Sequence, residues 1–228
     1  MAVGKPRVEV EPSLSRRSAT VVRLGVAVTL ALFALSPSIP HRYLHYALLV
    51  FIHPWLFRRA LGLRLEPIHV VWVSLGVFLH PLGGAFGFYD SVWWWDHLTH
   101  VAAASLVAAL AYVLASAYVR TESTAAVPAW TVPVAVLTVS LAAGLCWEGI
   151  ELAHPELVVY GETDTALDAV FNVVGAALTL WLGPRVLDTL VDQLVPGGPS
   201  ADVCGEDSGD TGLQPELPEE SDPTQYSD

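Results

Sequence analysis

Six long apolar runs divide this chain, and such runs fit the interior of a lipid bilayer. The 228 residues are 53% hydrophobic and only 15% charged, a balance typical of an integral membrane protein. A backbone in lipid must satisfy its own hydrogen bonds, so each run predicts an α-helix. The predicted spans are residues 21–35, 43–57, 68–82, 97–119, 131–152 and 165–187. We therefore expect an all-α polytopic membrane helical bundle of about six transmembrane helices.

The first apolar run has two readings. Residues 15–17 (Ser-Arg-Arg) are similar to the start of a twin-arginine signal peptide, which would be cleaved. Against cleavage, Ala19 and Thr20 stand where larger apolar residues are expected, and Pro37 is poorly placed for a cleavage site. We take the run as the first span.

Basic residues sort to one predicted side of the membrane. The leader at 1–20, the start of the first span, the loops at 58–64 and 119–130 and the end of the last span hold ten of the eleven Lys and Arg residues. The opposite side holds only Arg42. Because basic loops stay in the cytoplasm, both termini are predicted to be cytoplasmic in a multi-pass cell-membrane protein.

An acidic tail accounts for most of the net charge of −12. Residues 197–228 carry nine Asp and Glu residues and no Lys or Arg, a composition that predicts disorder. The chain is thus divided into a basic leader at 1–20, a membrane domain at 21–187 and a disordered cytoplasmic tail. The acidic surface and single lysine are typical of a salt-adapted organism, although a GC-rich genome also depletes lysine.

Three groups of polar residues interrupt the last three spans. They are Asp96 and His100 at the start of the fourth span, Glu148 and Glu151 near the end of the fifth, and Asp164, Asp168, Asn172 and Gly175 at the start of the sixth. Within each group a spacing of three or four residues puts the side chains on one helix face. The six-span topology brings all three groups to the outer side. A charged group facing lipid costs about 2.5 kcal/mol or more, so we expect these residues to face inward. Glu148, Asp168 and His100 are expected to lie within about 8 Å, close enough to share a metal ion or a proton.

Simpler explanations cover only part of this pattern. Asp164 could stabilise the start of the sixth helix, because acids favour helix N-termini. That explanation does not reach Asp168 or Asn172, which lie one and two turns further in. His97 is expected to point toward lipid headgroups. The tryptophans at 93–95 and Trp147 are expected to anchor the chain at the interface.

The three motifs resemble those of the VanZ-like membrane proteins and of the YjdF-type inner-membrane proteins. Those proteins show D-x-x-x-H at the start of one helix and E-x-x-Q or E-x-x-E on the next. A D-x-x-x-N-x-x-G or D-x-x-x-D pattern opens their last helix. The resemblance covers roughly residues 89–183, and it implies a largely uncharacterised membrane protein, some relatives of which are associated with glycopeptide resistance. The arginine often found before the last motif is replaced here by residues 160–162 (Tyr-Gly-Glu).

Carboxylates with an imidazole suit a divalent ion such as Mg²⁺, Mn²⁺ or Zn²⁺. The candidate ligands are Asp96, His100, Glu148, Glu151, Asp164 and Asp168. The candidate catalytic residues are Glu148, Asp168 and His100, with Asn172 as a further polar residue. Without a metal, crowded carboxylates would favour holding a proton.

These features leave several functions open. The first is a metal-dependent enzyme or metal-binding protein that acts on an envelope lipid or lipid-linked molecule. Few basic residues are predicted near the site, so an anionic headgroup would need the metal. The alternatives are a proton-coupled carrier and a structural or partner-binding membrane protein. The expected partner is the lipid bilayer, and nothing indicates a nucleic acid.

Overall fold

The computed structural model describes residues 14–35, 44–122, 127–153 and 162–197, and the regular elements in these ranges are all helices. They are α1 (Arg16–Leu35), α2 (Leu44–Leu61), α3 (Pro67–Phe86), α4 (Phe88–Ser91), α5 (Trp95–Thr121), α6 (Thr131–Ala153), α7 (Glu162–Val186) and α8 (Asp188–Leu194). The predicted all-α fold is confirmed. The predicted tail and most of the leader lie outside the described residues.

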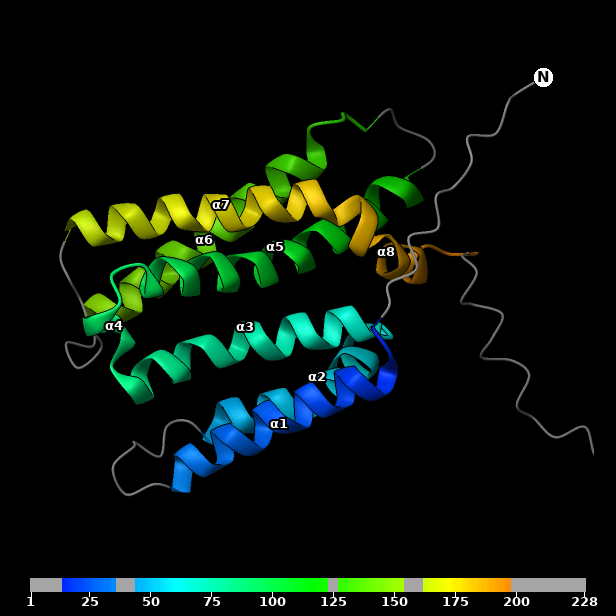
Figure 1. Cartoon of the computed structure of the whole chain (residues 1–228). Helices are drawn as coiled ribbons and strands as arrows, with labels where there is room; N and C mark the ends of the chain where they lie inside the picture. Colours follow the sequence, from blue (N-terminus) through cyan, green and yellow to red (C-terminus); the bar gives the residue numbers. More distant parts are fainter. Residues whose placement is uncertain (1–13, 36–43, 123–126, 154–161, 198–228) are drawn as a thin grey trace, which may run out of the picture.

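The six long helices run in alternating directions (Figure 1). The first residues of α1, α3 and α6 lie at the same end of the bundle as the last residues of α2, α5 and α7. At the opposite end, on the left of Figure 1, α5 and α7 begin and α6 ends. The helices that carry the three polar motifs therefore place them at one end of the molecule, as the predicted topology requires.

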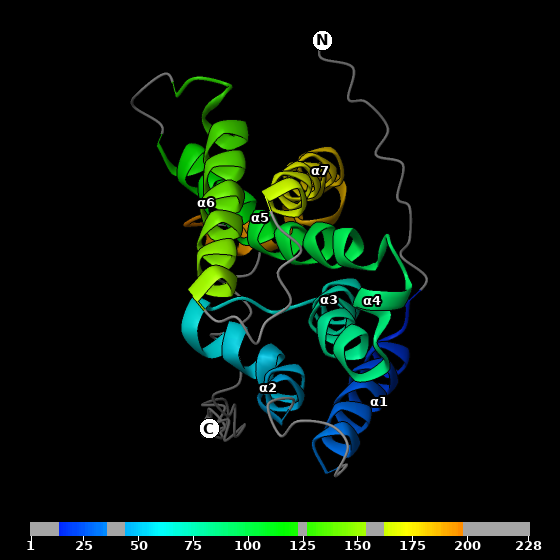
Figure 2. The same cartoon turned by 90° about the vertical axis from the view of Figure 1, so that its left-hand side faces the viewer.

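Five of the described helices are long and apolar enough to cross a membrane: α1, α3, α5, α6 and most of α7. Helix α2 is not among them, because Arg58 and Arg59 in its last turn lower its hydropathy. It also contains Pro54, which removes a backbone hydrogen bond and bends a helix. Figure 2 shows the bend in α2. The molecule is a multi-pass helical membrane protein, and the second predicted span, which corresponds to α2, stays a prediction.

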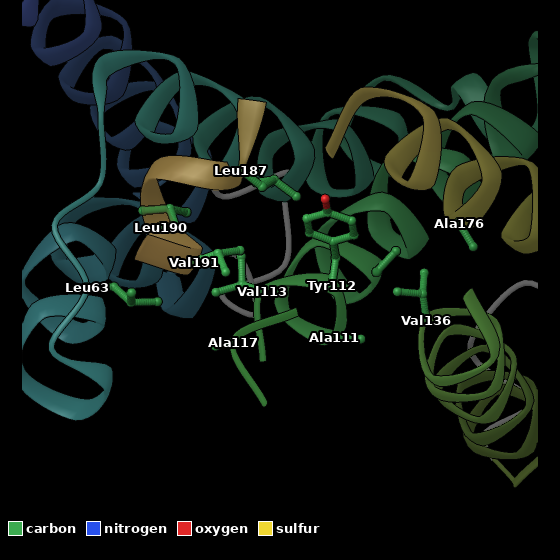
Figure 3. Close-up of a cluster of buried hydrophobic side chains, with 11 residues drawn as sticks. Leu63, Ala111, Tyr112, Val113, Ala117, Val136, Ala176, Leu187, Leu190 and Val191 are labelled. Carbon is green, nitrogen blue, oxygen red and sulfur yellow. The ribbon is translucent and has the colours of Figure 1, made fainter. Parts of the chain in front are cut away.

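The helices pack in two groups that meet where α3 contacts α5. In the first group, Val26 and Leu30 of α1 pack with Val50 of α2. In the second group, α5 contacts α6, α7 and α8. Figure 3 shows the core of this second group, in which Tyr112 and Val113 lie beside residues of α6, α7 and α8. Helix α5 is thus the centre of the half that carries the motifs.

Close helix approach depends on glycine at the α5–α7 contact. A Cβ atom at Gly175 would lie 2.5 Å from the carbonyl oxygen of Val101 and 3.0 Å from the Cβ of Ala104. The first distance is too short for any side chain, and the second would force Ala104 to shift. Gly175 therefore lets the backbones of α5 and α7 touch, as small residues do in membrane helix pairs.

Helix α3 corrects one boundary of the sequence analysis. The predicted third span ended at 82, but the helix continues through Pro81 to Phe86 and ends at Gly87, whose φ is 65°. Gly83 is needed inside the helix because a Cβ there would overlap the Trp95 and Tyr89 side chains. Trp95 is consequently buried and is not an interface anchor, whereas Trp93 and Trp94 remain exposed.

A set of polar contacts holds α8 against the end of the bundle opposite to the motifs. Arg120 at the end of α5 donates hydrogen bonds to Asp188 and Asp192 of α8, at 2.8 and 2.6 Å. The side chain of Gln193 accepts from the backbone N–H of Arg64 at 2.7 Å and donates to its carbonyl oxygen at 3.2 Å. The predicted sixth span ended at 187 without this short helix, which follows α7 directly.

Candidate metal centre

The site forms where the first turns of α5 and α7 face each other. Helix α5 begins at Trp95, so Asp96 and His100 lie in its first two turns. Helix α7 begins at Glu162, which places Asp168 nearly two turns inside it. The contact at Gly175 brings the two helices close enough for these side chains to meet.

Asp96, His100 and Asp168 form the closest group. His100 Nε2 lies 3.6 Å from Asp96 Oδ1 and 3.5 Å from Asp168 Oδ1. One potential ligand atom from each residue lies within 4.8 Å of the others. Asp168 is only 2% exposed, and its Oδ1 has no hydrogen-bond partner within the described ranges. The structure thus brings together two helices and three predicted site residues.

The spacing of these atoms is that of ligands rather than of hydrogen-bonded partners. Hydrogen bonds between nitrogen and oxygen span about 2.7–3.2 Å, shorter than either contact of His100. Two ligands of a tetrahedral ion, each about 2.0–2.1 Å from the metal, lie about 3.3–3.4 Å apart. The contacts of 3.5 and 3.6 Å are close to this value. The ligand atoms of Asp96 and Asp168 lie within 4.8 Å of each other, so a small divalent cation would draw these two carboxylates closer together.

His97 also belongs to the site, contrary to the expectation that it faces lipid headgroups. Its ring stacks on Phe171 of α7, with centroids 4.4 Å apart and planes 10° apart. Its Nδ1 lies 3.6 Å from Asp168 Oδ1 and is buried without a hydrogen-bond partner in the described part of the chain. Helix α7 packs across the face of α5 between His97 and His100, so both rings reach Asp168. Helical spacing alone could not say on which side α7 would pack.

The acids of α6 border the same group. Glu148 is buried, and its Oε1 has no hydrogen-bond partner among the residues described. Glu151 accepts a hydrogen bond of 2.8 Å from Nε1 of Trp147. Glu148 and Glu151 lie three residues apart, so both carboxylates are on one face of α6. Trp147, which we expected to anchor the chain at the interface, is thus also a hydrogen-bond partner of a candidate site residue.

The two remaining predicted residues lie on α7. Asp164 is in the first turn, where the helix dipole favours an acid, and it also repels Asp168 and Asp96. Asn172 is 4% exposed and packs against α6, because Gly144 leaves room for its amide. A Cβ at Gly144 would overlap the Asn172 side chain. Asn172 therefore connects α7 to α6 next to the carboxylates.

Sequence reasoning gave no role to the aromatic group around His80, which covers one side of the site. His80 Nδ1 and the Tyr89 hydroxyl share a hydrogen bond of 2.7 Å, and the ring of His80 meets that of Trp147 edge to face. Burial raises the pKa of the Tyr89 phenol, so this group stays protonated. No spacing rule relates His80 to residues of α4 and α6, so only the tertiary structure could have found this group.

Comparison with known families agrees with the membrane architecture. The model of a family described as "predicted membrane protein (DUF2238)" matches residues 18–189. The chain belongs to this family. The match to DUF2238 runs from α1 into α8 and so includes the first three helices, which the motif resemblance at 89–183 did not cover. No curated protein and no solved structure matches the chain.

Proposed function

We propose that this DUF2238 protein binds a divalent cation through Asp96, His100 and Asp168 and acts on a lipid or lipid-linked molecule. The observation that carries the proposal is the group of three ligand atoms within 4.8 Å. Two carboxylates and one imidazole are hard or borderline ligands, suited to Mg²⁺, Mn²⁺ or Zn²⁺. With three protein ligands, such a site keeps positions for water and substrate.

The depth of the site supports a substrate that belongs to the membrane. Asp96 and His100 lie in the first turns of a helix that is long enough to span the bilayer, so they are expected close to the headgroup region. Trp93 and Trp94 precede them and are exposed, as interfacial tryptophans are. A divalent ion at this depth would polarise a phosphoryl or acyl ester and activate water.

The distribution of charge supports a role for the metal in substrate binding. Every arginine of the described ranges lies in the half of the bundle away from the site. An anionic headgroup would therefore meet mostly carboxylates at the site and would be repelled without a cation. We assign the candidate catalytic roles to Glu148, Asp168 and His100, which are all buried in the half of the bundle where α5 and α7 begin.

Metal analysis of the purified protein tests this proposal. We expect the detergent-solubilised wild type, equilibrated with Mn²⁺ or Zn²⁺ and then desalted, to retain metal. Asp168→Asn and His100→Ala should lose it, because each removes a ligand. Asp192→Asn is the matched control, since it removes an exposed carboxylate at the opposite end. Equal metal content in all four proteins would contradict the proposal.

A proton-coupled carrier is the second candidate. It is favoured by the crowding of acids around Asp168, which is repelled by Asp96, Asp164, Glu148 and Glu151. A buried carboxylate in such surroundings can load and release a proton. A wild type that retains no metal but moves protons when reconstituted in vesicles would support the carrier.

A further inference from the structure

A positive charge lies on the packed face of α1 without a counter-charge. Arg23 belongs to the stripe of this helix that includes the buried residues Ala19, Val26 and Leu30, at spacings of three and four. Its Nε is buried and has no hydrogen-bond partner among the described residues, and no ion pair between those residues includes it. A charged group inside a membrane span is costly unless an opposite charge is close. Arg23 therefore needs an anion.

The surrounding chain does not supply this anion. Residues 12–65 contain no Asp or Glu, so neither α1 nor α2 has a carboxylate. The two helices instead carry five arginines, because Arg16 and Arg17 begin α1 and Arg58 and Arg59 lie in the last turn of α2. The next acid along the chain, Glu66, is the N-cap residue of α3. The counter-charge of Arg23 is therefore expected to come from a bound molecule.

His53 of α2 lies at the same level as Arg23. Val50 packs with Val26, and α1 and α2 run in opposite directions (Figure 1). His53 follows Val50 by three residues and Arg23 precedes Val26 by three, so the two side chains come to one level. His53 is completely buried, and its Nδ1 donates to the carbonyl oxygen of Val50 at 2.8 Å. Its Nε2 is then an acceptor, and it has no partner in the described part of the chain.

An interaction with His53 would satisfy only a small part of Arg23. The guanidinium has five N–H donors, so a bond from Nε to the imidazole would leave the four donors of Nη1 and Nη2 and the whole positive charge. Two parallel N–H groups of this kind bind two oxygens of a phosphate. Arg23 lies about 10 Å along the helix from Arg16, and its side chain points back toward that end, where the headgroups lie.

We propose that Arg23 binds the phosphate group of an anionic phospholipid between α1 and α2, with His53 as the residue that positions the guanidinium. A soluble phosphate compound offers the same chemistry. The depth of Arg23 favours a phosphate attached to acyl chains, which can lie along the apolar surfaces of α1 and α2. The site lies at the end of the bundle opposite to Asp168, so this inference is independent of the proposed function.

Lipid titrations of the full-length, delipidated protein in detergent test this site. We expect phosphatidylglycerol to bind the wild type and raise its thermal midpoint more than phosphatidylcholine or inorganic phosphate does. Arg23→Gln should bind phosphatidylglycerol about tenfold or more weakly, because it loses a charged hydrogen-bond donor. Without lipid it should melt no lower than the wild type, since it removes an unpaired charge. Arg185→Gln is the matched control, because Arg185 is an exposed arginine in the same half of the bundle.

Variants of His53 test its positioning role and keep the proposal testable if Arg23→Gln does not fold. His53→Phe should weaken phosphatidylglycerol binding, whereas His53→Gln should restore it, because the amide oxygen can replace Nε2 as an acceptor. Equal binding by these two variants would limit His53 to packing.

The remaining outcomes decide the ligand. Equal affinity of the wild type and Arg23→Gln for phosphatidylglycerol would overturn the site, and so would equal affinity of the wild type for phosphatidylglycerol and phosphatidylcholine. Stabilisation by inorganic phosphate alone, lost in Arg23→Gln, would replace the lipid by a soluble phosphate compound. Mn²⁺ retention should be unchanged in all these variants, so a failure of this site would leave the proposed function standing.

Discussion

Asp168 is the residue on which the site depends. It is almost completely buried on α7, and its Oδ1 lies within 3.6 Å of two imidazoles of α5. Hydrogen bonds do not hold this oxygen, because both contacts are longer than a hydrogen bond. The contacts that place it are instead those with Nδ1 of His97 and Nε2 of His100.

His97 gives a prediction about positioning. In His97→Phe the new ring keeps the stacking on Phe171 but loses the nitrogen that faces Asp168. Residues that orient a metal ligand typically change affinity by about 10–100-fold when they are replaced. We expect a loss of Mn²⁺ affinity of this size in a titration, with unchanged thermal stability.

The matched control for this variant is His45→Phe, which replaces an exposed histidine that also packs against an aromatic ring. His45→Phe should bind Mn²⁺ as the wild type does. If His97→Phe retained full affinity, the role of His97 would be limited to packing.

Helices α5, α6 and α7 were predictable from their apolar runs. Their alternating directions also predicted that the three polar motifs lie at the same end of the bundle. The three motifs lie at one end of the bundle because the chain reverses direction between them (Figure 1). Rotation about each helix axis was not predictable, since it depends on which faces pack. His97 and Trp95 illustrate this: their sequence neighbours indicated the interface, but close packing on Phe171 and at Gly83 buries them. Helix boundaries such as that of α3 also depended on contacts between distant residues.

Gly175 gives a prediction for the α5–α7 contact. In Gly175→Ala the added methyl group would push against the Val101 carbonyl, so the two helices must separate. Overpacking of this kind costs about 1–3 kcal/mol. We expect a lower thermal midpoint in detergent and weaker Mn²⁺ binding, because Asp168 moves with α7.

Gly149→Ala is the matched control, since it lies in α6 and a Cβ there would meet no atom within 4 Å in the described structure. Replacement of a helical glycine by alanine is expected to be neutral or to stabilise by about 0.5–1 kcal/mol. Equal loss of stability in both variants would mean that the close approach at Gly175 is not important.

At the scale of the whole molecule, the described bundle has an acidic end and a basic end. The described arginines lie in the half where α5 and α7 end, and the acidic site lies where they begin. By the positive-inside rule we predict that the bundle is oriented with its site outside the cytoplasm. The hydrogen bonds from Arg120 to Asp188 and Asp192 of α8 would then lie on the cytoplasmic side.

Thiol labelling tests this orientation. In a background that carries Cys146→Ser and Cys204→Ser, single cysteines replace Ser91 near the site or Glu122 at the other end, both exposed. We expect Ser91→Cys to react with a membrane-impermeant maleimide in intact cells. Glu122→Cys should react only after the cells are permeabilised. Labelling of both from outside would contradict the alternating topology.

Because the site residues come from different helices, they are synthesised at different times. Asp96 and His100 of α5 leave the ribosome before Asp168 of α7, which follows about seventy residues later. At typical elongation rates this delay is about 3–14 s. During that time the polar first turns of α5 lack Asp168, although α1, α2, α3 and α6 are all synthesised before it. Helices α3 and α6, which both contact α5, are therefore available to cover those residues until α7 arrives.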